Sequence, residues 1–498
     1  MISFDCQPAR SGHGAELLKL LILAVLVGAT GALAVLAFRW LLVFAETLLY
    51  GPGPGLVAHA QALSPLPRLL SPALGGLLAG LILQYLVEAR RGKGGADYME
   101  AIFAGGEMPV AGSLLKSSAS AASVVSGGSI GREGSMVQLA ALTGSVLADW
   151  LRLPPDRRHF LIACGAAAGV AGAYNTPIAG ALFVAEIVLG GVTVSGLAPL
   201  LLASVTSDLI VRQITKVGPI YYAASPCSLT TAPELLLTLA IGAGVGLLGA
   251  VFVCLLERAH AGFHSLSLPL WAKMALAGLA VGGLSLLRPE VWGNGYSVIN
   301  ALLHVPHPWK LVLLILLLKT LATVLTTGSG AVGGVFTPTL FVGAALGSLA
   351  GSLIHFFLPE AQASAYTLVG MGAFLAAVTH APLTAVVMVS EMSFGFTLVP
   401  ALALGCLSGY YVSMVLHGGS VYAHSKPSNH PTEPLEIEEN GGSARGAIVP
   451  GTSVRPARRY QGPVDRRQGG VGTKSGDASR GGGPGVCLKM NPETGRGG

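Results

Sequence analysis

Long uncharged apolar segments, separated by short stretches rich in glycine, proline or charge, dominate the chain. Leu20–Phe38 contains no charged residue and is long enough to cross a hydrocarbon core about 30 Å thick. Further apolar segments lie at Leu69–Val87, Phe160–Val188 (interrupted only by Glu186), Leu235–Leu256, Leu311–Leu318 and Pro400–Leu416. Because the apolar character continues after the first segment, we expect that segment to remain as a span rather than to be a cleaved signal peptide.

The composition agrees with this pattern. Mean hydropathy is +0.65 and charged residues make up 11% of the chain, whereas soluble domains carry about 25%. The fold class expected is therefore an all-α polytopic membrane protein. The six cysteines are scattered without metal-ligand spacing, so we expect no metal and no cofactor.

The distribution of charge predicts an orientation in the membrane. Two loops are basic, with Arg90, Arg91 and Lys93 in one and Arg152, Arg157 and Arg158 in the other, while the loop around 48–68 carries only Arg68. By the positive-inside rule, the basic loops and both termini are cytoplasmic. The net charge of +6 is explained by this topology and by the C-terminal residues, so no nucleic-acid partner is expected.

Three regions differ in composition. We expect a cytoplasmic leader over 1–14, a transmembrane domain over 15–425 and a disordered C-terminal tail over 426–498. The tail is rich in Pro, Gly, Arg and Ser and has too few aliphatic residues to form a core. A spurious extension of the reading frame is an alternative explanation for it.

An internal repeat divides the transmembrane domain into halves of about 15–215 and 230–425. Lys116 matches Lys319 at an offset of 203, and the same offset places Glu133 on Phe336. Further along, Glu186 matches Glu391 at an offset of 205. Duplicated halves in a membrane protein often meet at a binding site near the middle of the bilayer.

The first glycine-rich loop carries an ionisable pair, since Gly131, Arg132, Glu133, Gly134 and Ser135 follow one another between two apolar segments. An ionisable residue at membrane depth is costly and indicates function. A helix that begins here would present free N–H groups to an anion. Glu133 could occupy that anion site and leave it when protonated, which would make it a gate. The alternatives are a helix-capping glutamate or an ion-pair partner for Arg132.

The second loop, Gly333 to Pro338, offers similar chemistry without a charge. Pro338 suits the first turn of a helix, which would leave the amides of Val335 and Phe336 free to face an anion. A glycine-rich packing turn is the alternative. Neither loop has the G-x-x-x-x-G-K-[ST] pattern, so a phosphate-binding enzyme is rejected.

These loops, together with Tyr174-Asn175-Thr176-Pro177, resemble the signatures of the CLC chloride channels and chloride/proton antiporters. The segment Ala96 to Glu100 further resembles the bacterial ClcB-type voltage-gated channels of that family. The resemblance covers about residues 15–425. It implies two inverted repeats, re-entrant half-helices, a homodimer with one pore per subunit, and chloride as the ion carried across a bacterial inner membrane.

The resemblance also implies roles for individual residues. Glu133 matches the gating glutamate of the family. Val335 and Phe336 match positions whose amides bind chloride, with Gly334 heading the same motif. Tyr422 lies where the family has a tyrosine whose hydroxyl faces the ion, or is an interfacial tyrosine at the end of a span.

Two positions depart from the family pattern. Ala96 replaces a chloride-ligating serine, and Asp97 is then expected to be a helix N-cap. Ile187 replaces the glutamate that usually follows Glu186 in antiporters, and isoleucine cannot carry a proton. Glu186 and Glu391 remain as candidate acid sites, although structural roles near helix ends are favoured for both. The sequence therefore favours a channel and leaves open a chloride/proton antiporter or, from another class, an organic-anion transporter.

Overall fold

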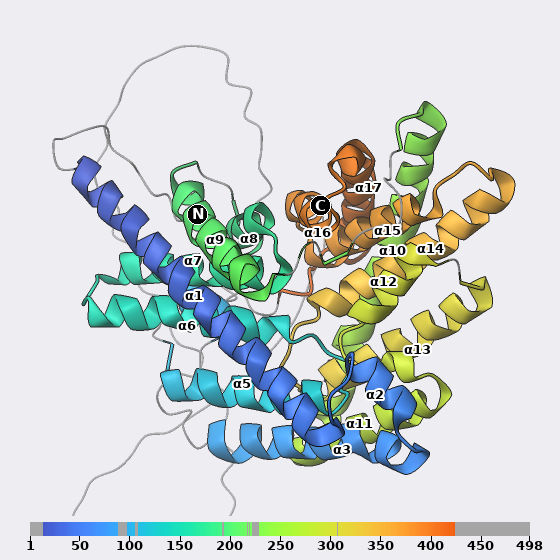
Figure 1. The fold of residues 1–498 in the computed structure, drawn as a ribbon, viewed down its shortest axis with the longest axis horizontal. Helices are drawn as coiled ribbons and strands as arrows, with labels where there is room; N and C mark the ends of the chain where they lie inside the picture. Colours follow the sequence, from blue (N-terminus) through green and yellow to red (C-terminus); the bar gives the residue numbers. More distant parts are fainter. Residues whose placement is uncertain are drawn as a thin grey trace, which may run out of the picture. The chain divides into compact units, whose positions relative to one another are not determined.

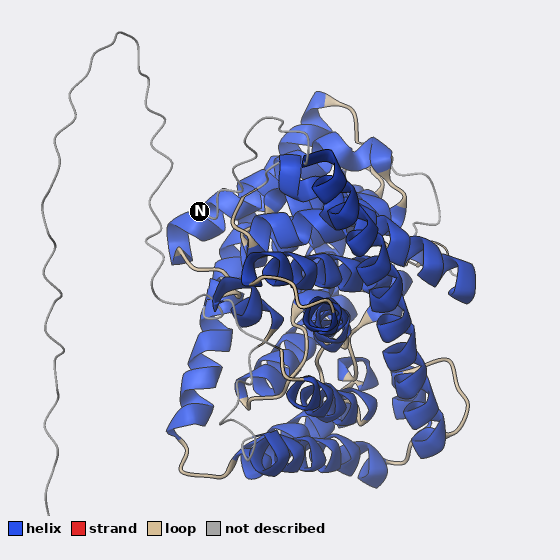
Figure 2. Cartoon of the chain, turned by 90° about the vertical axis from the view of Figure 1, so that its left-hand side faces the viewer, coloured by secondary structure: helices blue, strands red, loops and turns tan. Residues whose placement is uncertain are grey.

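The computed structural model of the chain describes residues 13–87, 97–104, 108–191, 194–216, 218, 220–221, 229–305 and 307–423. These residues are almost entirely helical (Figure 1, Figure 2), and the described part contains one isolated β-bridge and no other strand pairing. The predicted tail, almost all of the predicted leader, and the residues Arg90, Arg91, Lys93 and Ala96 lie outside the described residues.

In the first half of the chain, the residues that the structure describes form nine α-helices, two of them followed by a π-helical turn. They are α1 (His13–Tyr50), α2 (Leu56–Ala62), α3 (Pro65–Leu81) with its turn Ile82–Val87, α4 (Tyr98–Ala104), α5 (Val110–Val125), α6 (Glu133–Trp150), α7 (Pro155–Tyr174), α8 (Pro177–Phe183) with its turn Val184–Val188, and α9 (Val194–Thr215).

The second half repeats this order from α10 onward, with two short 3-10 turns at Pro289–Val291 and Phe396–Leu398. Its helices are α10 (Ala232–Ser265), α11 (Leu270–Leu287), α12 (Tyr296–His304), α13 (Trp309–Gly328), α14 (Phe336–Phe357), α15 (Ala363–Thr379), α16 (Pro382–Ser393) and α17 (Val399–His417).

The packing within the two halves is equivalent. Helix α1 packs against α9 as α10 packs against α17, and the pair α6 and α7 corresponds to the pair α14 and α15 (Figure 1). Contacts between the halves join equivalent elements, because α3 packs on α11 and α8 on α16. The predicted duplication is therefore present in three dimensions.

Eight helices are long and apolar enough to cross a membrane among the residues that the structure describes. Large apolar side chains such as Phe44, Leu48 and Val415 are exposed on their outer faces. A patch of this extent would be unfavourable in water, but a surrounding bilayer covers it. Helices α4, α8 and α12 have seven, seven and nine residues, too few to cross the bilayer at about 1.5 Å per residue.

The segment Phe160–Val188, expected from its apolar character to be a single long stretch, is broken in the structure. Helix α7 ends at Tyr174, where Asn175 adopts left-handed backbone angles (φ 55°), and Pro177 starts α8. The second half breaks in the same way, with His380 at φ 57° and Pro382 starting α16. Proline lacks the N–H that would be orphaned in a first turn, so each break ends one helix and starts a second, shorter one.

The two halves also approach closely where α3 packs against α11. A Cβ atom on Gly278 or Gly282 would overlap the backbone carbonyls of Pro72 and Leu69, respectively. Small residues at helix crossings allow such close approach in membranes. The contact packs the outer parts of the two halves together.

Candidate functional site

The two glycine-rich loops meet directly in the structure. The Gly131 N–H donates to the Gly334 carbonyl (2.7 Å), and the Gly334 N–H donates to the Gly131 carbonyl (2.8 Å), which forms an antiparallel bridge. A Cβ on Gly134 would lie 3.0 Å from the Gly334 nitrogen. Glycine at these positions therefore lets the two backbones touch, and equivalent points of the repeat are joined at the centre of the molecule.

The bridge changes the expectation for Gly334. Its amide is taken by the Gly131 carbonyl, so this N–H is unavailable to an anion and Gly334 acts by shaping the loop. Val335 and Phe336 come next, at the start of α14. Neither of their amides donates a hydrogen bond to another described residue. These two N–H groups are available to a ligand at this helix terminus.

Glu133 is the first residue of α6 and is only 2% exposed. Its Oε1 accepts a hydrogen bond from Asn294 Nδ2 (3.1 Å). Its Oε2 has no hydrogen-bond partner among the described residues, and it points back toward Gly131, where an added Cβ would overlap it. A buried carboxylate with one unpartnered oxygen is unusual in a folded protein.

An aromatic cluster surrounds Phe336 on the other side of the bridge. Tyr174 lies 5.0 Å and Phe183 lies 6.0 Å from the Phe336 ring centroid. Tyr422 packs edge-on against Phe183 at 6.0 Å, and the neighbouring Val421 N–H is tied to the Val378 carbonyl. The ring contacts thus place two of the predicted site residues, Phe336 and Tyr422, in one aromatic cluster. Glu133 lies beside the bridge, since a Cβ on Gly334 would be 3.7 Å from its Oε2.

Arg132 is not the ion-pair partner of Glu133. Its guanidinium lies over the Tyr296 ring, 5.8 Å from the centroid, a cation–π arrangement. Arg39 of α1 also faces this region, and its Nη2 donates to the Gly172 carbonyl (3.4 Å). The site therefore contains one buried carboxylate, and the guanidinium of Arg132 lies on Tyr296 rather than pairing with it.

Glu186 and Glu391 form a reciprocal pair of helix caps. Glu391 accepts hydrogen bonds from the Ile178 and Ala179 amides at the start of α8 (3.0 and 2.9 Å). Glu186 accepts from the Leu383 and Thr384 amides at the start of α16 (3.3 and 2.8 Å) and from the Thr384 hydroxyl. Each carboxylate satisfies orphan amides in the opposite half.

Asp97 precedes α4, and its carbonyl accepts the Ala101 amide of that helix (2.8 Å). Its side chain forms an ion pair with Lys116 (3.1 Å), so its charge is compensated. The neighbouring residue Ala96, which replaces the serine of the family pattern, lies outside the described residues. The Tyr98 amide donates to Gln138 Oε1 (2.9 Å), which ties the start of α4 to α6.

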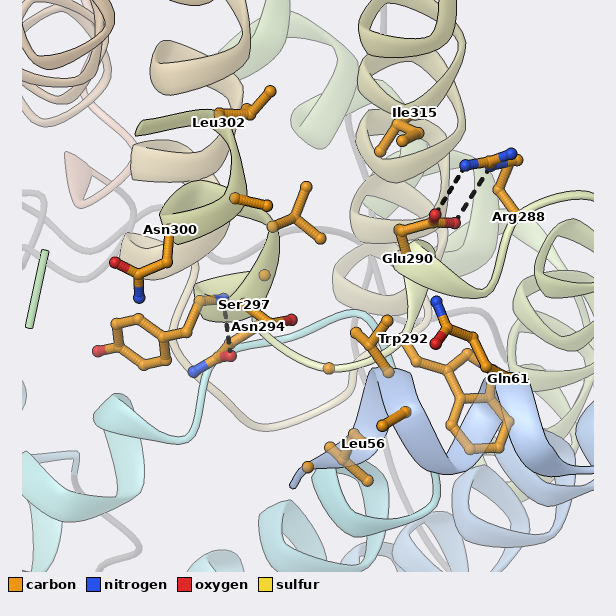
Figure 3. Close-up of a pocket in the computed structure, with 18 of the residues that line it drawn as sticks. Leu56, Gln61, Arg288, Glu290, Trp292, Asn294, Ser297, Asn300, Leu302 and Ile315 are labelled. Atoms are coloured by element: carbon orange, nitrogen blue, oxygen red, sulfur yellow. Dashed lines mark hydrogen bonds and ion pairs between the residues drawn. The ribbon is translucent and has the colours of Figure 1, made fainter. Parts of the chain in front are cut away.

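A pocket of about 760 Å³ is lined by residues that include Arg132 and Asn294, and Figure 3 shows Asn294 in its wall. Its wall carries the charged pair Arg288 and Glu290, whose side chains make two hydrogen bonds (3.2 and 2.7 Å). Glu46, near the end of α1, also lines it.

Sequence reasoning missed Asn294 and Lys319 as contributors to the site. Asn294 is 161 residues from Glu133 and lies in no recognisable motif. Lys319 was seen as a repeat partner of Lys116, and it is fully buried beside the segment that carries Asn294. The available signal was Lys319 itself, which directly follows the apolar run Leu311–Leu318. A charge at this place in a membrane segment must find buried partners.

Fold and site together define an all-helical, multi-span membrane protein made of two related halves that meet at a buried carboxylate. Residues 75–414 match the family described as Voltage gated chloride channel. A ClcB-like chloride channel protein of Ralstonia nicotianae is 49% identical over 82% of this chain and 97% of its own length. The voltage-gated ClC-type chloride channel ClcB of Escherichia coli is 41% identical over 81% of this chain and 97% of its own length. The chain therefore belongs to the voltage-gated chloride channel (CLC) family, whose members are channels and transporters and not enzymes.

Solved structures share this fold. A slow cyanobacterial Cl⁻/H⁺ antiporter matches with a TM-score of 0.69 and 22% identity over 82% of this chain and 96% of that one. A CLC-type fluoride/proton antiporter matches with a TM-score of 0.66 and 25% identity over 84% of this chain and all of that one. The predicted CLC-type fold is confirmed.

Proposed function

We propose that the chain carries chloride across the bacterial inner membrane through a pathway that Glu133 closes, and that it works as a passive channel. The main support is the position of Glu133, buried at the bridge between the two loops and close to the free amides of Val335 and Phe336. Its Escherichia coli relative bears the name of a voltage-gated chloride channel.

The Glu133 carboxylate is an anion next to a site suited to anions. While it is charged and buried, it competes with an incoming chloride for the positive ends of α6 and α14. Protonation or displacement of the side chain would leave these helix termini to the ion. Amide dipoles bind an anion favourably but not deeply, so ions can enter and leave. Tyr422 would supply a hydroxyl from the other side.

The channel is favoured over the chloride/proton antiporter by Glu186 and Ile187. Glu186 is held by three hydrogen bonds at the start of α16, and Ile187 follows it. Three hydrogen bonds to the first turn of a helix in the other half suit a structural role better than the uptake and release of protons. Likewise, the direct bridge between the loops leaves no room there for a large organic anion.

Measuring chloride efflux from liposomes tests the gate. We expect Glu133→Gln to raise the flux and to flatten its dependence on external pH, because glutamine does not titrate. Glu290→Gln is the matched control: this carboxylate lines the pocket but is paired with Arg288, and the wild-type pH dependence should persist. Unchanged pH dependence in Glu133→Gln would remove Glu133 from this role.

The reversal potential across a pH gradient separates channel from antiporter. A passive channel stays at the chloride Nernst potential at every gradient. A reversal potential that moves with the proton gradient would identify proton-coupled exchange on the same fold, as in the cyanobacterial and fluoride antiporters that share it.

We further propose that both termini are cytoplasmic and that two copies form a dimer. Arg157 pairs with Glu16 near the start of α1 (3.0 Å), so the basic loop and the N-terminal end lie on one side, and the pocket beside Glu46 would face the periplasm. A membrane-impermeant thiol reagent should label Ser297→Cys in a cysteine-free background from outside the cell.

Light scattering in detergent should give a dimer mass, and an active monomer would disprove the dimer.

A further inference from the structure

Asn294 provides the one hydrogen bond that the Glu133 carboxylate receives from the described residues. The bond joins Asn294 Nδ2 to Glu133 Oε1 at 3.1 Å. The Asn294 side-chain oxygen in turn accepts the Tyr296 amide at 3.4 Å (Figure 3). Because this second bond takes up the oxygen of the side-chain amide, the NH₂ group is the end that faces Glu133.

The backbone around Asn294 is shaped to present this side chain. Gly293 and Gly295 both have positive φ angles, 66° and 96°. Residues other than glycine rarely adopt such angles, so the two glycines form a tight turn with Asn294 at its centre. α12 begins directly after the turn, at Tyr296.

A buried lysine anchors the preceding residues. Lys319 of α13 is fully buried, and its Nζ donates to the carbonyls of Val291 (2.8 Å), Trp292 (3.5 Å) and Gly293. Trp292 is itself fully buried, and its indole lies against Gly127, where an added Cβ would overlap the ring. The segment that carries Asn294 is therefore fixed both to α13 and to the loop that leads to Glu133.

Other titratable groups influence Glu133 only through space. The groups that face it from the surrounding elements are Arg39, Arg132, Tyr174, Tyr221, Tyr296 and Tyr422. None of them donates a hydrogen bond to the carboxylate within the described part of the chain. A hydrogen bond to the charged form of an acid favours that form, so the amide of Asn294 has a direct influence on the charge and position of Glu133.

We propose that Asn294 is a positioning residue for the gate: its side-chain amide holds the Glu133 carboxylate in the buried position, and Lys319 holds Asn294 in place. This inference rests on the proposed role of Glu133. Loss of the amide should free the side chain and favour its protonated form. The channel should then open at higher pH than the wild type.

Chloride efflux from liposomes, measured against external pH, tests the proposal. We expect Asn294→Leu, similar in size but without a donor, to raise the pH of half-maximal flux by about one unit, a tenfold change in proton affinity. Asn300→Leu is the matched control. Asn300 lines the same pocket but donates to the Ile220 carbonyl, and its pH midpoint should stay at the wild-type value.

A double variant separates this inference from the proposed function. In a Glu133→Gln background, Asn294→Leu should change nothing further, because the group it acts on no longer titrates. An unchanged midpoint in Asn294→Leu, or an equal effect with and without Glu133, would overturn the role of Asn294 even if Glu133 is the gate. Should Asn294→Leu fail to fold, Asn294→Ala removes the same donor with less bulk. Glu133→Gln alone with wild-type pH dependence would instead refute the gate.

Discussion

The two central loops share a backbone but differ in the side chain at the equivalent position. Both α6 and α14 begin after a residue with similar helical angles, Arg132 at φ −80° and Val335 at φ −90°. The first half then places the carboxylate of Glu133 at the helix terminus, and the second half places the ring of Phe336 there. The positive helix end in the first half thus carries a carboxylate of the protein itself, whereas the side chain at the helix end in the second half is uncharged. The two halves therefore share the backbone geometry at this point but differ in the chemistry of the side chain.

The lysines at equivalent positions of the two halves, Lys116 and Lys319, also differ in their surroundings. Lys116 of the first half pairs with the exposed Asp97, whereas Lys319 is fully buried and bound to backbone carbonyls. Each half thus has a lysine at the equivalent position of α5 and α13, and the second one is bound to the backbone that precedes Asn294.

The largest expected difference between the halves follows from these lysines. Lys319→Met should lower the free energy of unfolding by about 3 kcal/mol, because it leaves buried carbonyls without a donor. Lys116→Met should cost less than about 1 kcal/mol, as expected for a partly exposed ion pair. Denaturation in detergent measures both, and equal losses would contradict the assignment of different roles.

The losses of stability on removal of the two helix caps, Glu391 and Glu186, should be closer to equal. Glu391→Ala removes the acceptor for two amides of α8 and should cost about 2 kcal/mol. Glu186→Ala should cost somewhat less, because its bond to Leu383 is longer and exposed. If both acids are structural, the reversal potential of either variant stays at the chloride value. A shift of that potential in Glu186→Ala alone would indicate a role in proton movement.

The glycines of the bridge should respond differently although they are paired. A Cβ on Gly131 would overlap the Glu133 carboxylate and lie 2.7 Å from the Gly334 oxygen, while a Cβ on Gly334 has 3.0 Å to its nearest neighbour. Gly131→Ala should cost about 1 kcal/mol and raise chloride flux by displacing Glu133. Gly334→Ala should leave flux less affected. A larger flux change in Gly334→Ala than in Gly131→Ala would indicate that the loop carrying Gly334 limits the flux.

The smallest effect is expected outside the repeats. Deletion of 430–498 should leave both folding and chloride flux unchanged, because the family match ends at residue 414 and Tyr422 precedes the cut. Liposome efflux of the truncated protein checks this. A truncated protein that inserts normally but carries no chloride would make the tail part of the mechanism.

Much of the architecture could be read from the chain. The apolar segments predict an α-helical membrane protein, and the offset that places Glu133 on Phe336 predicts two halves that meet at these loops. The length and hydropathy of Phe160–Val188 did not predict the break between α7 and α8 at Asn175. Apolar half-helices buried in protein have the same composition as parts of a full span, so length and hydropathy do not separate them.

The sequence by itself determined the membrane class, the duplication and the residue types at the centre, because these depend on composition and on local spacing. Only the tertiary structure decided which amides remain free. The bridge takes the amide of Gly334, and long-range packing brings Asn294 to Glu133 and crosses the caps Glu186 and Glu391 between halves. A hydrogen bond depends on the position of both partners, and for residues more than a hundred positions apart the folded chain alone sets that position.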